Sequence, residues 1–145
     1  MSTESLVSRA RTMCEQKGAR FTAIREKVFR LMAESQGGQG AYELLEQLKA
    51  TEPAAKPATI YRALEFLTEQ GFIHKIESNN AFMLCHHFGH HHPAQLLICQ
   101  HCGNVTELHS SALQQEFSRL AEISGFVLQH QTIEGLGTCR SCQQN

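Results

Sequence analysis

The sequence has no long apolar run, and this absence argues against membrane-spanning and secreted proteins. A transmembrane helix needs about 20 consecutive apolar residues and a signal peptide needs a shorter apolar core near the N-terminus, and neither pattern occurs here. The chain of 145 residues also lacks internal repeats, and its histidine run is the only low-complexity segment. Hydrophobic residues make up 41% of it, enough for the cores of one or two small domains. We expect a cytoplasmic protein without a membrane partner.

Two catalytic zinc signatures are also missing. The chain contains neither the His-Glu-x-x-His pair of a zinc protease nor the His-x-Glu with Pro-Cys-x-x-Cys of a deaminase. A zinc hydrolase needs an open coordination position and a general base, so these absences argue against an enzyme and against a small-molecule substrate. A hydrolase stays as an alternative, which turnover in a broad substrate screen would support.

The net charge of −1 conceals an asymmetry between the two halves of the chain. Eleven of the 13 lysines and arginines lie before residue 80, whereas eight of the nine histidines lie after it. Basic side chains suit phosphates, and histidines suit metal ions. We therefore expect the first half to contact nucleic acid and the second half to bind metal.

Two Cys-x-x-Cys motifs stand out among the residues that are present, Cys99-Gln-His-Cys102 and Cys139-Arg-Ser-Cys142. A two-residue gap lets both sulfurs of a motif reach one ion, and zinc prefers four ligands in a tetrahedron. The motifs therefore predict a structural zinc site made by Cys99, Cys102, Cys139 and Cys142. Two disulfides or two redox dithiols are the alternatives. Six cysteines without a secretory signal indicate a reducing compartment, where thiols bind metal more often than they pair.

A second group of metal-binding residue types lies just upstream, in Cys85-His-His-Phe-Gly-His-His-His92. A structural zinc in the four-cysteine site does not need these residues. We interpret this group as the part of the chain that senses metal. Residues 85–92 would then form a histidine-rich hinge loop between a first domain, 1–84, and a second domain, 93–145.

The first domain is predicted to be mostly helical. Apolar residues recur at helical spacing in four segments, 4–16, 22–33, 41–49 and 57–70. Cys14 shares the apolar stripe of the first segment, so we expect a buried thiol there. Two strands, 72–77 and 81–85, follow and are joined by the turn signal Ser78-Asn79-Asn80. Short helices closed by a β-hairpin predict a winged helix-turn-helix domain.

In that fold the last long helix enters the major groove of DNA with its N-terminal residues at the base edges. Thr59, Tyr61 and Arg62 occupy that end of the predicted helix. Arginine can pair with guanine, and threonine or tyrosine can contact a thymine methyl group. Charge for the phosphates would come from the basic residues of the first two helices, Arg9, Arg11, Lys17, Arg20, Arg25, Lys27 and Arg30. A solvated basic face on an ordinary helical domain is the alternative.

The second domain is predicted to be a small α/β unit, which makes the whole chain an α+β protein. Residues 95–98 and 105–108 have the pattern of strands that flank the first cysteine motif. A capping box at Ser111 opens a helix that ends at Ser124, residues 126–134 form a further strand, and 135–137 turn into the second motif. Such a short sheet has open edges, so we expect a homodimer.

Several strings in the sequence resemble the ferric uptake regulator family, and within it the zinc uptake regulators. The matching strings are Arg20-Phe-Thr22, Ala41-Tyr42-Glu-Leu-Leu, Lys56-Pro-Ala-Thr-Ile-Tyr-Arg-Ala-Leu64, Gly71-Phe-Ile-His74-Lys and His74-Lys-Ile-Glu-Ser-Asn-Asn-Ala-Phe-Met-Leu-Cys85-His. The two Cys-x-x-Cys motifs complete the match, which spans nearly the whole chain. The resemblance implies a dimeric bacterial repressor that binds AT-rich palindromic operators of zinc-uptake genes when zinc is bound. Together with the helix pattern it gives a set of expected DNA-binding residues: Arg20, Thr22, Arg25, Tyr42, Thr59, Tyr61 and Arg62.

The resemblance also implies two zinc ions (Zn2+) per chain, one structural and one regulatory. It assigns the structural ion to the four cysteines and the regulatory ion, which bridges the two domains, to His74, Cys85, His92 and Glu107. One sulfur, two imidazoles and one carboxylate suit tetrahedral zinc better than an octahedral, oxygen-rich site. A metal held by both domains would fix the spacing of the two recognition helices in a dimer.

Departures from the family pattern leave some alternatives open. Iron- and peroxide-sensing relatives carry His-His-Asp-His before the first cysteine motif, and its absence here argues against both signals. Ile24 replaces a glutamine common in the family. His90 or His91 could take the place of His92, and His109 or His130 could form a further site. A zinc buffer or chaperone would explain the histidines but not the predicted recognition helix.

Overall fold

The computed structural model describes residues 2–35, 37–88 and 92–144, which form two compact units, residues 1–91 and 92–145. None of the helices within these described ranges combines the length and the apolar character needed to cross a membrane.

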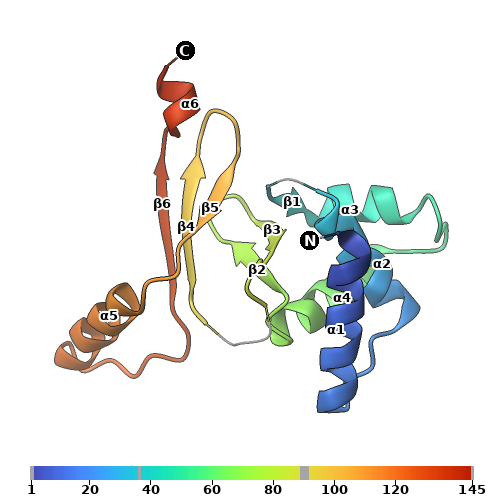
Figure 1. Cartoon of the computed structure of the whole chain (residues 1–145), viewed down its shortest axis with the longest axis horizontal. Coiled ribbons are helices and arrows are strands. Elements are labelled where there is room, and N and C mark those ends of the chain that lie inside the picture. The colour runs from blue at the N-terminus through green and yellow to red at the C-terminus, as the bar shows by residue number, and fades with distance from the viewer. Residues whose placement is uncertain (1, 36, 89–91, 145) are drawn as a thin grey trace. The chain divides into compact units, whose positions relative to one another are not determined.

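The helices of the first unit follow the predicted segments closely (Figure 1). They are α1 (Thr3–Lys17), α2 (Ala23–Ala33), α3 (Ala41–Leu48) and α4 (Pro57–Glu69). The hydroxyl of Thr22 accepts a hydrogen bond from the backbone N–H of Arg25 at 3.3 Å, so Thr22 is the N-cap of α2. Cys14 is buried on the inner face of α1, as predicted.

A three-stranded antiparallel sheet completes the first unit. It consists of β1 (Gln39–Gly40), β2 (Ile73–Ile76) and β3 (Ala81–Leu84) in the order β1-β3-β2. Asn80, in the turn between β2 and β3, has φ of 51°, a left-handed conformation that asparagine tolerates in tight turns. The two-residue β1 has no strand signal in the sequence, because it lies in the glycine-rich run Gly37-Gly38-Gln39-Gly40. The unit is a winged helix-turn-helix domain, with the β2–β3 hairpin as its wing.

The core of the first unit contains a cluster of phenylalanines that reaches past the wing. The rings of Phe29, Phe72 and Phe88 contact one another edge to face, with centroids 5.2 to 5.9 Å apart. Phe88 is fully buried, and the guanidinium of Arg9 lies 4.9 Å from the centre of its ring. The expected hinge loop, 85–92, therefore begins with residues that are packed into the first unit. Residues 89–91, which include His90 and His91, lie outside the described residues.

The second unit is built on a mixed sheet of β4 (Ala94–Cys99), β5 (Val105–Glu107) and β6 (Thr132–Gly137). The strand β4 lies in the centre, antiparallel to β5 and parallel to β6. Figure 1 shows α5 (Ser111–Ile123) beyond one end of this sheet and the short α6 (Arg140–Gln143) beyond the other. The α+β class of the chain is thus as predicted.

Three predictions for the second unit are wrong. The last strand is Thr132–Gly137 and not 126–134, because its length is set by pairing with β4, from Ala94↔Thr132 to Cys99↔Gly137. Residues 135–137 therefore lie in the strand and are not a turn. A Cβ at Gly135 would lie 3.1 Å from Cδ2 of Leu97, so a glycine there allows close packing. The N-cap of α5 is Ser110 and not Ser111, because the Ser110 hydroxyl accepts from the Leu113 N–H at 3.1 Å.

Candidate metal centre and nucleic-acid interface

The two cysteine motifs meet because β4 and β6 run parallel and end together. Cys99 is the last residue of β4 and pairs with Gly137, the last residue of β6. Gly103, with φ of 77°, turns the chain back after the first motif, and its N–H donates to the carbonyl of Cys99 at 3.0 Å. Cys139 is the N-cap of α6, which carries Cys142. Both motifs therefore lie at the same end of the sheet.

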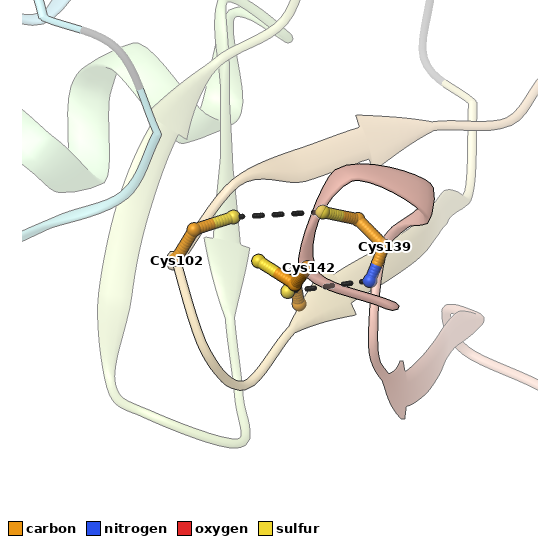
Figure 2. A group of neighbouring side chains, drawn as sticks. Cys102, Cys139 and Cys142 are labelled. Carbon is orange, nitrogen blue, oxygen red and sulfur yellow. Dashed lines mark hydrogen bonds between the residues drawn. The ribbon is translucent and has the colours of Figure 1, made fainter. Parts of the chain in front are cut away.

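The four sulfurs of this cluster have the spacing of a tetrahedral zinc site. The Sγ atoms of Cys99, Cys102, Cys139 and Cys142 all lie within 4.8 Å of one another. Figure 2 shows Cys102 facing Cys139, with 3.8 Å between their Sγ atoms and Cys142 beside them. Zinc–sulfur bonds of about 2.3 Å in a tetrahedron place neighbouring sulfurs about 3.8 Å apart. A disulfide needs about 2.05 Å, so the pair formed by Cys102 and Cys139 fits a shared ion and not a disulfide.

The protonation of these thiols also favours a bound cation. Backbone N–H groups, above all that of Cys139 at 3.3 Å, lower the pKa of the Cys99 thiol to about 5. The neighbouring sulfurs of Cys139 and Cys99 raise the pKa of Cys142 to about 12. Four thiolates in so small a space repel one another, and a dication removes that penalty. The residues present thus fit a zinc ion.

In the first unit, His74 and Cys85 lie on the wing. His74 is opposite Met83 in the hairpin, and the N–H of Cys85 donates to the carbonyl of Phe72 at 2.9 Å. This register makes His74 and Cys85 diagonal neighbours on one face of the hairpin, within reach of a common ligand. Both residues are buried, Cys85 completely.

In the second unit, His92 and Glu107 are in direct contact. Nε2 of His92 lies 3.1 Å from Oε2 of Glu107, which is at the end of β5. The side chain of Glu107 is only 5% exposed, and Nε2 of His109 lies 3.6 Å from the same oxygen. Of the two histidines considered for a further site, His109 is thus next to the His92–Glu107 pair, whereas His130 is exposed elsewhere in the unit.

The expected DNA-reading residues lie on the first turns of α4. Tyr61 and Arg62 are exposed, and Tyr61 is 51% exposed despite its large apolar ring. Thr59 is partly buried, and its hydroxyl accepts a hydrogen bond from the backbone N–H of Lys56 at 3.2 Å. The Thr59 hydroxyl therefore stabilises the start of α4, a role that the sequence did not reveal.

A second exposed tyrosine accompanies Tyr61. Tyr42, at the start of α3, is 75% exposed. The two rings border one apolar hollow at the N-terminal ends of α3 and α4, which is lined by Ala41, Tyr42, Leu45, Pro57, Ile60 and Tyr61. Apolar side chains of this kind contact thymine methyl groups in the major groove. The hollow is therefore a candidate contact for thymine methyl groups.

The basic residues of α1 and α2 have partners within the unit. Arg25 donates to the carbonyl of Arg20 at 2.6 Å, and its guanidinium lies 3.9 Å from the centre of the Phe66 ring. Further ion pairs join Arg11 to Glu26, Lys27 to Glu52 and Arg30 to Glu4. These contacts orient the basic side chains and reduce the charge that remains for phosphates. The exposed Arg20 and the partly buried Thr22 lie at the start of α2.

Comparisons with known proteins agree with this architecture. The model of the ferric uptake regulator family matches residues 16–135. The zinc uptake regulation protein of Escherichia coli (strain K12) is 43% identical over 142 residues, 97% of this chain and 83% of the relative. A solved zinc uptake regulator complexed with zinc and DNA is 42% identical with a TM-score of 0.95, over 99% of this chain and 97% of that one.

A crystal structure of holo XcZur is 38% identical with a TM-score of 0.91, and the match covers 99% of this chain and 100% of that chain. The family model covers most of the chain, and the relative from Escherichia coli is similar over nearly the full length of this chain. The chain belongs to the ferric uptake regulator family.

Proposed function

We propose that this protein is a zinc-responsive transcriptional repressor that binds operator DNA as a homodimer. The observation that carries the proposal is the likeness, over almost the entire chain, to a regulator solved with zinc and DNA. The family consists of regulators and not of enzymes, so the role is regulatory. The operators would be AT-rich palindromes at zinc-uptake genes, and the protein would act in the bacterial cytoplasm, where the DNA lies.

The first zinc ion of each chain would be structural. Cys99, Cys102, Cys139 and Cys142 offer four thiolates at tetrahedral spacing, which leaves no open position for a substrate. When bound, the zinc ion joins the two cysteine motifs at the end of the β4–β6 pair. The second unit has few buried apolar residues of its own, so this link contributes a large part of its stability.

The second zinc ion would be regulatory, with His74, Cys85, His92 and Glu107 as its ligands. The first unit offers His74 and Cys85 as neighbours on the wing, and the second offers His92 and Glu107 in contact. One sulfur and two imidazoles favour zinc over manganese, which prefers oxygen ligands. An ion that needs ligands from both units would restrict their relative motion, which is how the metal would control DNA binding.

DNA would be read by α4 and the start of α3. Arg62 is exposed and suits a guanine edge, and the hollow bordered by Tyr42 and Tyr61 suits a thymine methyl group. Contacts to the sugar-phosphate backbone of the DNA would complete the interface, and they would come from Arg20, Thr22, Arg25 and Thr59.

The homodimer would form through the second unit. The apolar residues Leu113, Phe117, Leu120 and Ile123 recur on one face of α5 and are 36% to 69% exposed in the single chain. Leu97 and Leu136, on the sheet, are 47% and 53% exposed. So much apolar surface on a small unit marks an interface, and a second copy of the chain offers the same surface in return.

Metal analysis and DNA-binding titrations test this function together. Duplexes would first be selected from a random library in the presence of excess zinc. The purified protein would then be titrated with the selected duplex at controlled free zinc, iron and manganese. We expect one tightly held zinc per chain, a second that binds reversibly, and tight DNA binding only when the second site is filled with zinc.

The outcomes distinguish the alternatives. Operator binding that responds to iron, or that is lost on peroxide treatment, would assign the protein to the iron- or peroxide-sensing branch. Tight zinc binding without any selected duplex would identify a zinc buffer or chaperone. Either result would overturn the proposal.

A further inference from the structure

Gln95 is a buried polar residue on the central strand of the second unit. It is 3% exposed, and its side-chain amide makes two hydrogen bonds with the backbone of one other residue, Ser110. Nε2 donates to the Ser110 carbonyl and Oε1 accepts from the Ser110 N–H, each at 3.0 Å. Both the N–H and the oxygen of the amide thus have a hydrogen-bond partner. The two bonds to one residue resemble those of a hydrogen-bonded pair in an antiparallel sheet.

These bonds continue the sheet beyond its last backbone pair. The strand β5 pairs with β4 up to Leu96↔Glu107, and the Leu108 N–H then donates to the Gln95 carbonyl at 2.7 Å. The Gln95 side chain adds the next connection, to Ser110. The segment 108–110, which joins β5 to α5, is therefore bonded at both ends to one residue of β4, Gln95.

The clamp formed by Gln95 and Ser110 joins the two chain segments that carry the proposed ligands of the second unit. His92 is three residues before Gln95, and Glu107 is three residues before Ser110. The His92 ring and the Glu107 carboxylate make a further contact between these two segments, at 3.1 Å. Glu107 is the last residue of β5 and is followed directly by the clamped segment, so loss of the clamp would loosen its position next to His92.

We infer that Gln95 is a positioning residue for the regulatory zinc. It holds Glu107 at the distance from His92 at which one ion can bind both. This inference rests on the proposed function, because it concerns the ligands of the regulatory site. An apolar side chain would fill the same buried position, but it would leave the N–H and carbonyl of Ser110 without these bonds.

The experiment is a double-mutant cycle on the full-length protein with its four-cysteine site loaded. Zinc affinity at the second site would be measured by competition with a chelator for the wild type, Gln95→Leu, Glu107→Ala and the double variant. Residues that orient metal ligands typically change metal affinity by about 10–100-fold, and we expect that loss for Gln95→Leu in the wild-type background. In the Glu107→Ala background, Gln95→Leu should have no further effect, because the ligand that it orients is already gone.

Gln131→Leu is the matched control. Gln131 also bonds α5 through its amide, to the Gln114 carbonyl at 3.3 Å and the Ser118 hydroxyl at 3.4 Å, and neither bond is to the segment 108–110. We expect its zinc affinity to equal that of the wild type. A spectrum of the second site filled with cobalt should change for Gln95→Leu and not for Gln131→Leu.

Two results would overturn the inference alone. One is wild-type zinc affinity in Gln95→Leu. The other is an equal loss with and without the Glu107 carboxylate, which would mean a general disturbance of the unit. A wild-type protein that binds no second zinc would overturn the proposed function itself, and the inference with it.

Discussion

The Sγ atoms of Cys102 and Cys139 lie 3.8 Å apart although the two residues are 37 positions apart in the sequence. Between them the chain forms β5, α5 and β6, so this contact closes a loop that contains most of the second unit. A bridge through a metal ion at this point removes much of the conformational freedom of the unfolded chain. The first prediction follows from this closure.

We expect Cys139→Ser to abolish both the dimer and the ordered structure of residues 93–142. The variant lacks one of four zinc ligands in a unit that is too small to be stable without the ion, because structural zinc contributes folding free energy directly. Sedimentation and amide hydrogen exchange would measure the two effects. His101→Ala is the control, because His101 is an exposed residue within the first motif. A dimeric Cys139→Ser protein that melts like the wild type would refute the structural role.

The second prediction separates base reading from phosphate binding. Arg62→Ala should weaken binding by about 1–3 kcal/mol per half-site and relax the preference at one base pair, because an exposed arginine on the first turns of α4 can pair with guanine. Binding would be measured against a panel of operators that differ at single positions. Loss of the same size at every operator would show that Arg62 contacts only phosphate.

The third prediction concerns Arg25, which has structural partners. Its guanidinium lies on the Phe66 ring and donates to the Arg20 carbonyl, so Arg25→Ala should lower the thermal stability of the first unit. It should also weaken binding to specific and non-specific DNA by the same factor. Calorimetry and the salt dependence of binding would show these two effects. Arg119→Ala, which removes an exposed arginine paired with Glu116 in the second unit, should change neither. Unchanged stability of the Arg25→Ala variant would mean that the Phe66 contact is energetically neutral.

The fourth prediction tests how firmly the start of the expected hinge is anchored. Phe88→Ala should destabilise the first unit by about 3–5 kcal/mol, because it removes a fully buried ring from the cluster with Phe29 and Phe72. Phe88→Leu keeps most of the volume and should cost much less. Denaturant unfolding would give both values. A Phe88→Ala protein as stable as the wild type would show that residues 85–88 are not part of the core.

Much of this structure could be predicted from local sequence signals. The helices of the first unit and the four-cysteine cluster both follow from spacing and residue type, because each depends on neighbours within a few residues or on the strict geometry of a metal. The apolar stripe of α5 was likewise predictable. The exposure of this stripe in the single chain was not predictable, because periodicity shows that a helix face is apolar but does not show which surface covers it.

Other features depend on long-range pairing that a single sequence does not reveal. The bounds of β6 are fixed by its register with β4, so the strand-like residues Phe126 and Val127 lie outside it and are exposed. The full set of proposed regulatory ligands is recognisable only through the family resemblance, because His74 and Glu107 stand alone in the sequence and carry no spacing signal. The clamp by Gln95 has no sequence signal either, since one glutamine in a strand gives no hint of its partner.

The last prediction concerns Cys85 and separates a regulator from a zinc-storing protein. Cys85 is the softest of the proposed regulatory ligands, so Cys85→Ser should sharply weaken zinc binding at the second site. The four-cysteine site does not use Cys85, and the wing strands keep their pairing. We therefore expect a folded dimer with one tight zinc per chain and no zinc-stimulated operator binding. Cys14→Ser replaces another buried cysteine of the same unit, outside both proposed sites, and should keep the zinc response.

Reciprocity makes this prediction quantitative. A coupling of about 1–3 kcal/mol between metal and DNA corresponds to a loss of about 5–150-fold in operator affinity when the regulatory zinc is absent. Operator DNA must then tighten zinc binding to the wild type by the same factor, because the two bindings share one thermodynamic cycle, and it should hardly affect zinc binding to Cys85→Ser. Zinc titrations of both proteins, with and without operator, measure this directly. Equal zinc affinity in the two wild-type titrations would show that the second site is not coupled to DNA, and Cys85 would then have no role in sensing.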